Sequence, residues 1–96
     1  MYVLITYDIN TTSKTGQTRL RKVAKICENY GQRVQNSVFE CKVSEAQFRD
    51  IQNKLIKTIN QETDSLRFYR LGKDYNRRVK HIGAKDTYNM DGPLIL

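Results

Sequence analysis

The sequence predicts a single α+β domain whose elements follow the order βαββαβ. Short β-branched and aromatic runs alternate with two stretches in which apolar residues recur at helical spacing. A length of 96 residues suits one domain. A hydrophobic content of 39%, with six Tyr and three Phe, is enough for a core and excludes a wholly disordered chain. This order of elements is typical of ferredoxin-like domains.

The first half of the chain predicts a strand, a loop and a helix. A continuous β-branched and aromatic run at 2–7 is typical of a strand buried on both faces, and Asp8 ends it. Polar residues at 10–13 indicate a loop. Apolar residues at helical spacing over 18–30 predict an amphipathic helix, and Gly31 directly after it is the expected stop.

The second half predicts strands around a further helix. Residues 33–43 read as a strand or a broken strand pair. Ser44 and Gln47 form a capping box that opens the next helix, because the hydroxyl can accept from the amide of residue 47 while Gln47 reaches back. The last clear strand is 65–71. The apolar residues of the second helix are expected on one face: Phe48, Ile51, Leu55, Ile56 and Ile59.

The C-terminal extension is expected to serve a homodimer. Residues 1–71 complete the ferredoxin-like core, which leaves 72–96 as an extension in which 79–82 could form a short strand. The chain ends on three apolar residues, 94–96, and an apolar end is ordered only when something holds it. We therefore expect an extra C-terminal strand that docks on the partner chain, which would add core to a short chain.

The charge of the chain points to a polyanionic partner. Seventeen Lys and Arg against ten Asp and Glu give a net charge of +7 and a pI near 9.6. Two basic zones, 13–35 and 67–85, flank a nearly neutral middle. No run approaches the ~20 apolar residues of a membrane span, and the start does not resemble a signal peptide. These features predict a cytoplasmic protein without a membrane partner.

Asp8 is the first candidate for chemistry. A carboxylate at the end of a buried strand can hold a hard cation such as Mg²⁺, which could polarise a phosphodiester. The alternative is that Asp8 only accepts hydrogen bonds from backbone amides in the following turn. Because one carboxylate is a poor metal site, the first interpretation needs two copies of Asp8 brought together by a two-fold axis.

Basic residues on the first helix form the second candidate. Arg19 and Lys22, and likewise Arg21 and Lys25, are spaced so that each pair shares part of the helix surface and repels. Phosphates would offset this repulsion through contacts that ignore sequence and weaken with salt. The alternative is a solvated face that only keeps the protein soluble. The same two interpretations apply to Arg77 and Arg78.

Aromatic and sulfur side chains offer weaker candidates. Phe39 and three tyrosines could stack on bases, although aromatic residues in strands more often lie in a core or a dimer interface. Cys27 and Cys41 have no metal-ligand spacing, which excludes a zinc site and favours core thiols. The three tyrosines are Tyr7, Tyr69 and Tyr75.

Four segments, in order, resemble the small CRISPR-associated adaptation family Cas-two (Cas2): 7–9, 19–25, 31–40 and 68–71. The match runs over essentially the full chain, and the Ser-Val-Phe-Glu block at 37–40 is specific to that context. The resemblance implies a ferredoxin-like homodimer whose C-terminal strand adds to the partner's sheet. It also implies that Asp8 of both chains holds one Mg²⁺, or another divalent cation, per dimer.

The same resemblance implies two functions. The family is described as metal-dependent endonucleases on double-stranded DNA or single-stranded RNA, and as the central subunit between Cas-one (Cas1) integrase dimers in spacer acquisition. Four residues match family positions linked to nucleic-acid handling and catalysis beside Asp8: Arg19, Arg21, Arg33 and Phe39. Some members carry a second acid after the strand, where this chain has Ile9 and Asn10. The first hypothesis is therefore a nuclease, and the alternative is a non-catalytic DNA-binding scaffold that bridges Cas1 dimers.

Overall fold

The computed structural model describes residues 1–83 and confirms an α+β fold with the order βαββαβ. Residues 84–96, including the apolar end at 94–96, lie outside the described part of the chain. A short helix follows the last strand. The elements are β1 (Tyr2–Asp8), α1 (Lys14–Glu28), β2 (Gly31–Gln35), β3 (Val38–Lys42), α2 (Glu45–Thr58), β4 (Ser65–Leu71) and α3 (Tyr75–Arg78).

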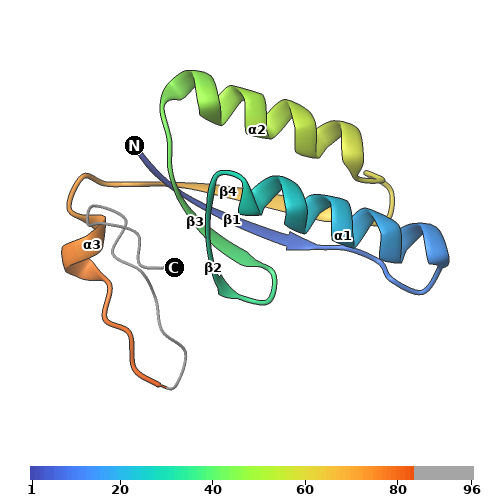
Figure 1. Cartoon of the computed structure of the whole chain (residues 1–96), viewed down its shortest axis with the longest axis horizontal. Helices are drawn as coiled ribbons and strands as arrows, with labels where there is room; N and C mark the ends of the chain where they lie inside the picture. Colours follow the sequence, from blue (N-terminus) through green and yellow to red (C-terminus); the bar gives the residue numbers. More distant parts are fainter. Residues whose placement is uncertain (84–96) are drawn as a thin grey trace.

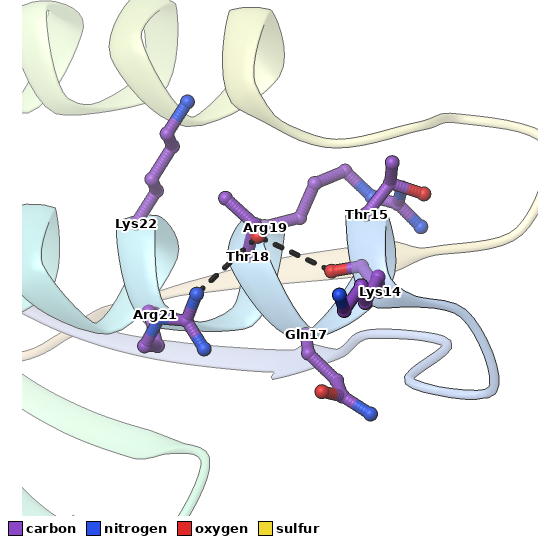
Figure 2. A pocket seen from close by; sticks show the side chains of 7 residues that line it. All are labelled: Lys14, Thr15, Gln17, Thr18, Arg19, Arg21 and Lys22. Carbon is purple, nitrogen blue, oxygen red and sulfur yellow. Dashed lines mark hydrogen bonds between the residues drawn. The ribbon is translucent and has the colours of Figure 1, made fainter.

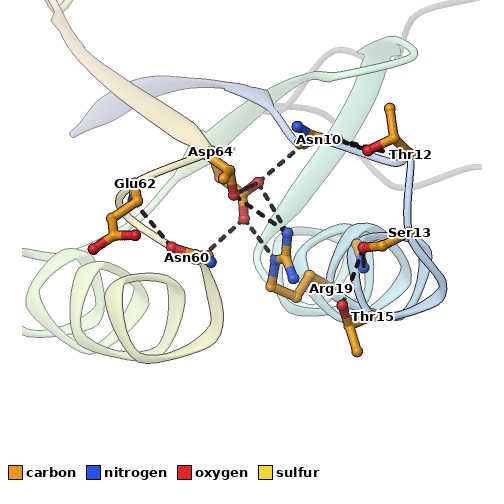
Figure 3. Close-up of polar contacts among 10 residues, drawn as sticks. Asn10, Thr12, Ser13, Thr15, Arg19, Asn60, Glu62 and Asp64 are labelled. Atoms are coloured by element: carbon orange, nitrogen blue, oxygen red, sulfur yellow. Dashed lines mark hydrogen bonds and ion pairs between the residues drawn. The ribbon is translucent and has the colours of Figure 1, made fainter.

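The sheet has the strand order β2-β3-β1-β4, and all neighbours run antiparallel. Both α1 and α2 lie against the same face, as Figures 1 and 3 show. Val3, Ile5 and Tyr7 of β1 are buried, whereas Leu4 is only half-buried and Asp8 is exposed. The expectation that the first strand is buried on both faces is met only in part in the single chain. On the second face Tyr2 is buried, but Leu4 and Thr6 are half-buried because the helices cover only the other side.

Helix α1 begins and ends earlier than the apolar pattern predicts. It begins at Lys14 because the Ser13 hydroxyl caps it and accepts from the amide of Gly16 at 3.1 Å. The first turn carries no apolar stripe, so the periodicity did not reveal it. The helix ends at Glu28, and Gly31 is the first residue of β2 rather than a helix stop. A Cβ on Gly31 would overlap the carbonyl oxygen of Glu40 on β3, so the close approach of two strands requires glycine there.

The second helix and the strands around it follow their local signals closely. Both halves of the capping box form, with Gln47 donating its amide to the Ser44 hydroxyl at 3.1 Å and accepting from the Ser44 amide at 2.9 Å. The 33–43 segment is a strand pair, and β4 matches the predicted 65–71. One apolar residue departs from the pattern: Ile56 is 46% exposed and belongs to the outer side of α2.

The described part of the extension begins with the short helix α3. Within residues 1–83, the segment 79–82 belongs to no strand, and its pairing with a second chain stays a prediction. Among residues 1–83, no helix has the length and apolar character that crossing a bilayer requires. Cys27 and Cys41 are buried free thiols, and burial raises the pKa of each to about 12, which confirms their assignment to the core.

Candidate active site and nucleic-acid interface

Asp8 is exposed at the end of β1, opposite Ser65 of β4. Within residues 1–83 its carboxylate makes no hydrogen bond and no ion pair. The turn that follows is held by other groups: Asp64 accepts from the amide of Asn10 at 3.0 Å, and the Asn10 side chain accepts from the amide of Thr12 at 3.0 Å. The alternative in which Asp8 serves this turn is therefore wrong, and no residue of the described part of the chain occupies its oxygens.

The donor chemistry at Asp8 fits a hard cation only in part. Mg²⁺ accepts carboxylate oxygens and keeps several waters, so one exposed carboxylate can contribute a ligand. Residues 1–83 hold no cluster of three or more His, Cys, Asp or Glu side chains that could bind a metal ion. A second carboxylate would have to come from another copy of the chain.

Arg19 is engaged by an acid distant in sequence. Its Nε donates to Asp64 Oδ2 at 2.7 Å and its Nη2 to Asp64 Oδ1 at 3.3 Å (Figure 3). The Asp64 side chain is fully buried, and that of Arg19 is 18% exposed. The Arg19 guanidinium, together with the amides of Asn60 and Asn10, holds the pKa of the Asp64 carboxyl well below its usual range. Arg19 is therefore not a free phosphate ligand.

Asp64 is a functional residue that the sequence analysis does not identify, because its partner Arg19 lies 45 residues away along the chain. A signal was present in α1. Arg19 precedes Val23 by four residues and Cys27 by eight, and both of these are fully buried. An arginine on the buried stripe of a helix requires a buried acid as partner, and the acids of the opposite helix–strand connection were the candidates.

The exposed side of α1 forms a basic groove. It has a volume of about 570 Å³ and lies along the first half of the helix (Figure 2). Arg21 donates to the Thr18 hydroxyl at 3.3 Å and makes no ion pair within residues 1–83. Figure 2 shows the Arg19 side chain pointing away from Arg21 and Lys22. The lining residues are Lys14, Thr15, Gln17, Thr18, Arg19, Arg21 and Lys22.

Lys14, Lys22 and Lys25 are exposed on α1 and likewise form no ion pair with any described residue. Their charges are not neutralised within the described chain. This surface can hold an anion, and its arrangement suits the phosphates of a nucleic-acid backbone.

Phe39 is buried rather than available for stacking. Its ring is 0% exposed and lies 6.2 Å from the ring of Tyr7, centroid to centroid. The Arg33 guanidinium covers it at 5.1 Å from the ring centroid. Direct contact of Phe39 with a nucleic acid or with reacting atoms is therefore contradicted, because helix α1 and the sheet enclose the ring. Arg33 is 45% exposed and pairs loosely with Glu28 at 3.4 Å, so it can still face a ligand.

The basic residues do not converge on a single point. Arg77 and Arg78 are exposed on α3, which follows β4 at the end of the sheet where Leu71 pairs with Tyr2. Asp8 and the start of α1 lie at the other end, one strand length or about 20 Å away (Figure 1). Tyr69 is 38% exposed, and its hydroxyl accepts from Arg67 at 3.0 Å.

Comparison with known proteins finds relatives that bear the same family name. A family model described as CRISPR associated protein Cas2 matches residues 1–79. A protein of Halalkalibacterium halodurans named CRISPR-associated endonuclease Cas2 is 57% identical over 95 residues, which cover 99% of each chain. A protein of Chlorobaculum tepidum named CRISPR-associated endoribonuclease Cas2 is 52% identical over 96 residues, the whole of both chains.

Solved structures agree with the sequence matches. The crystal structure of Streptococcus pyogenes Cas2 superposes with a TM-score of 0.79 and 58% identity, over 86% of this chain and all of that one. A chain from a structure described as a partial Cas6-RT-Cas1–Cas2 complex superposes with a TM-score of 0.65 and 29% identity, over 84% of this chain and 89% of that one. Sequence and fold together show that the chain belongs to the CRISPR-associated Cas2 family.

Proposed function

We propose that this chain is a CRISPR adaptation nuclease that hydrolyses phosphodiester bonds in double-stranded DNA, single-stranded RNA or both. The observation that carries the proposal is the exposed Asp8 carboxylate, which no described residue engages, beside a basic helix. The names endonuclease and endoribonuclease borne by relatives at 57% and 52% identity support it. The role places the protein in the cytoplasm with the nucleic acids that it handles.

The proposed active form is a homodimer with one Mg²⁺, or another divalent cation, held by two copies of Asp8. The uncovered face of the sheet supports this form, because half-buried Leu4, Val38 and Leu71 lie there beside Tyr69. An isologous contact through that face would present the same residues twice. The apolar end at 94–96, which lies outside the described residues, is expected to add to this interface.

Each residue group would have a separate task. A bound divalent cation supplies Lewis-acid polarisation of the phosphoryl oxygen and lowers the pKa of a bound water. Asp8 would hold the cation. Arg21, Lys22 and Lys25 would hold the backbone phosphates along α1, and Arg33 would contribute a further positive charge from β2.

A second candidate function is a non-catalytic scaffold that holds duplex DNA between Cas1 integrase dimers. Arg77 and Arg78 favour it, since they are exposed at the end of the sheet far from Asp8 and extend the basic surface beyond one active site. The likeness to a chain of a Cas1–Cas2 complex supports Cas1 as the partner. In this case, charge reversal at both arginines weakens duplex binding and lowers its salt dependence, while unchanged binding contradicts this surface.

The deciding experiment measures cleavage of labelled duplex DNA and single-stranded RNA by the wild type and Asp8→Asn, with Mg²⁺ and with EDTA. Asp74→Asn is the matched control, because it removes the same charge from an exposed position at the opposite end of the sheet. We expect Asp8→Asn to lose cleavage at least ~100-fold while binding survives, since metal stabilisation of the transition state amounts to several kcal/mol. Metal-dependent cleavage that survives in Asp8→Asn overturns the nuclease proposal and favours the scaffold.

A further inference from the structure

Asp64 gathers five hydrogen bonds on one buried carboxylate. Oδ2 accepts from Arg19 Nε at 2.7 Å and from the amide of Asn60 at 2.9 Å. Oδ1 accepts from the amide of Asn10 at 3.0 Å, the Thr63 hydroxyl at 3.2 Å and Arg19 Nη2 at 3.3 Å. The side chain of Asp64 is 0% exposed. Because both oxygens accept several hydrogen bonds, this carboxylate holds the segments that supply the donors in fixed positions (Figure 3).

These segments lie on both sides of Asp8. Asn10 follows Asp8 by two residues, and Ser65, the residue after Asp64, is the register partner of Asp8 on β4. The segment that follows β1 is also held by helix α1. The Asn10 carbonyl packs against the first turn of α1 at Gly16, where a Cβ would overlap the oxygen. The position of Asp8 therefore depends on the Asp64 carboxylate.

Arg19 and Arg21 differ sharply although both lie on α1. The Arg19 side chain is 18% exposed and makes a two-point ion pair with Asp64. Arg21 is exposed and lies in the basic groove with only a hydroxyl as a partner among the described residues. A phosphate could recruit Arg21 at no cost to the fold, but recruiting Arg19 would leave a buried carboxylate without its cation.

We propose that Asp64 and Arg19 form a positioning pair that holds the segment after β1 and thereby aims Asp8, and that Arg19 supports cleavage through this pair rather than by binding phosphate. The inference rests on the proposed nuclease function. It assigns a role to Asp64 and separates Arg19 from the phosphate-binding residues of α1. Lysine cannot replace Arg19 in this role, because a single ammonium does not reproduce the Nε and Nη2 geometry on the two oxygens.

The first test measures the salt dependence of binding to labelled duplex DNA in EDTA, which reports phosphate contacts without any cleavage. Arg21→Gln is expected to lower the slope of log K against log salt by about 0.9 for each phosphate contact that is lost. Arg19→Gln is expected to leave the slope unchanged. A slope that falls equally in Arg19→Gln and Arg21→Gln makes Arg19 a phosphate ligand and overturns the inference.

The second test measures kcat and KM for cleavage with Mg²⁺ in Arg19→Lys, Asp64→Asn and their double variant. Each single change is expected to lower kcat on the order of 10- to 100-fold with little change in KM, the effect of misplacing a catalytic group by about 1 Å. The double variant is expected to lose no more than either single variant, because both changes break one pair. Additive losses, or wild-type kcat in Arg19→Lys, contradict a positioning role.

Folding is checked by circular dichroism for every variant at the assay temperature. If Asp64→Asn does not fold, Thr63→Ala removes one donor to the same carboxylate and a long contact at 3.5 Å from Arg19 Nη2, and it is expected to lower kcat roughly two- to fivefold, about the equivalent of one hydrogen bond. Wild-type kcat in Thr63→Ala and Arg19→Lys overturns the inference.

Asp8→Asn distinguishes the two proposals. If Asp8→Asn cleaves as the wild type does, the proposed nuclease site is wrong and this inference fails with it. If Asp8→Asn is inactive while Arg19→Lys cleaves as the wild type does, this inference alone is refuted.

Discussion

Replacing Asp64 by asparagine should destabilise the fold, with a size that follows from its hydrogen bonds. One Asn oxygen can accept from only part of the donors around it, and its amide group would face the guanidinium of Arg19 or a backbone N–H. At least one of the partly buried backbone amides of Asn10 and Asn60 then lacks an acceptor, and Arg19 loses its counter-charge. We expect a loss of about 2–3 kcal/mol in the free energy of unfolding, a large share of the ~5–15 kcal/mol of a domain.

The destabilisation caused by Asp64→Asn should depend on pH, and the pKa of Asp64 sets the direction of this dependence. The pKa of Asp64 is lower in the folded chain than in the unfolded chain, chiefly because Arg19 donates to the carboxylate. The stability that Asp64 contributes is therefore fully present above its unfolded pKa of about 4, and it is lost as the pH falls from there toward the folded pKa. The difference between the wild type and Asp64→Asn should be constant near pH 7 and should narrow below about pH 4.

Urea unfolding followed by circular dichroism measures both the loss in the free energy of unfolding and its dependence on pH. With m of about 1–1.5 kcal/mol per molar, the midpoint of Asp64→Asn should fall by about 2 M at pH 7. Repeating the titration at a higher protein concentration separates this effect from a change in dimerisation. Asp50→Asn is the control, because Asp50 is 53% exposed in its pair with Lys54 and an asparagine oxygen can still accept from the Tyr30 hydroxyl, so the midpoint should stay nearly unchanged. A midpoint shift below about 0.5 M, or a difference that persists undiminished at pH 3, refutes the reasoning.

Three further changes test the local architecture by the same unfolding measurement. Phe39→Ala should cost about 3–5 kcal/mol because the ring is fully buried; a stable variant with lost nucleic-acid binding would instead restore a stacking role. Gly16→Ala should destabilise the chain even though alanine is favoured over glycine in a helix by up to ~1 kcal/mol, since the Cβ overlaps the Asn10 carbonyl oxygen, and a raised midpoint would show that the segment after β1 yields. Ser44→Ala should cost about 1 kcal/mol through loss of the capping box, and an unchanged midpoint would mean that water replaces the cap.

Local signals in the sequence predicted most of the fold. The capping box placed the start of α2, and the rough alternation of apolar residues over 65–71 placed β4 at its observed bounds. These features depend on residues a few positions apart, so they can be recognised without a partner. The start of α1 was missed because its first turn is polar. Gly31 was misassigned because the close contact that requires glycine is made across the strand pair, with Glu40 of β3, and no local pattern around Gly31 reveals it.

The sequence by itself determined the element order, the basic character of the first helix and the prominence of Asp8 at the end of β1. Tertiary structure decided which of these side chains are available. It buried Phe39 and bound Arg19 to Asp64, 45 residues along the chain, while within residues 1–83 it left Asp8 and Arg21 exposed and without an ion pair. The physical reason is that periodicity reveals which face of a helix is buried, whereas a charge finds its partner only when packing brings α1 against the segment that precedes β4.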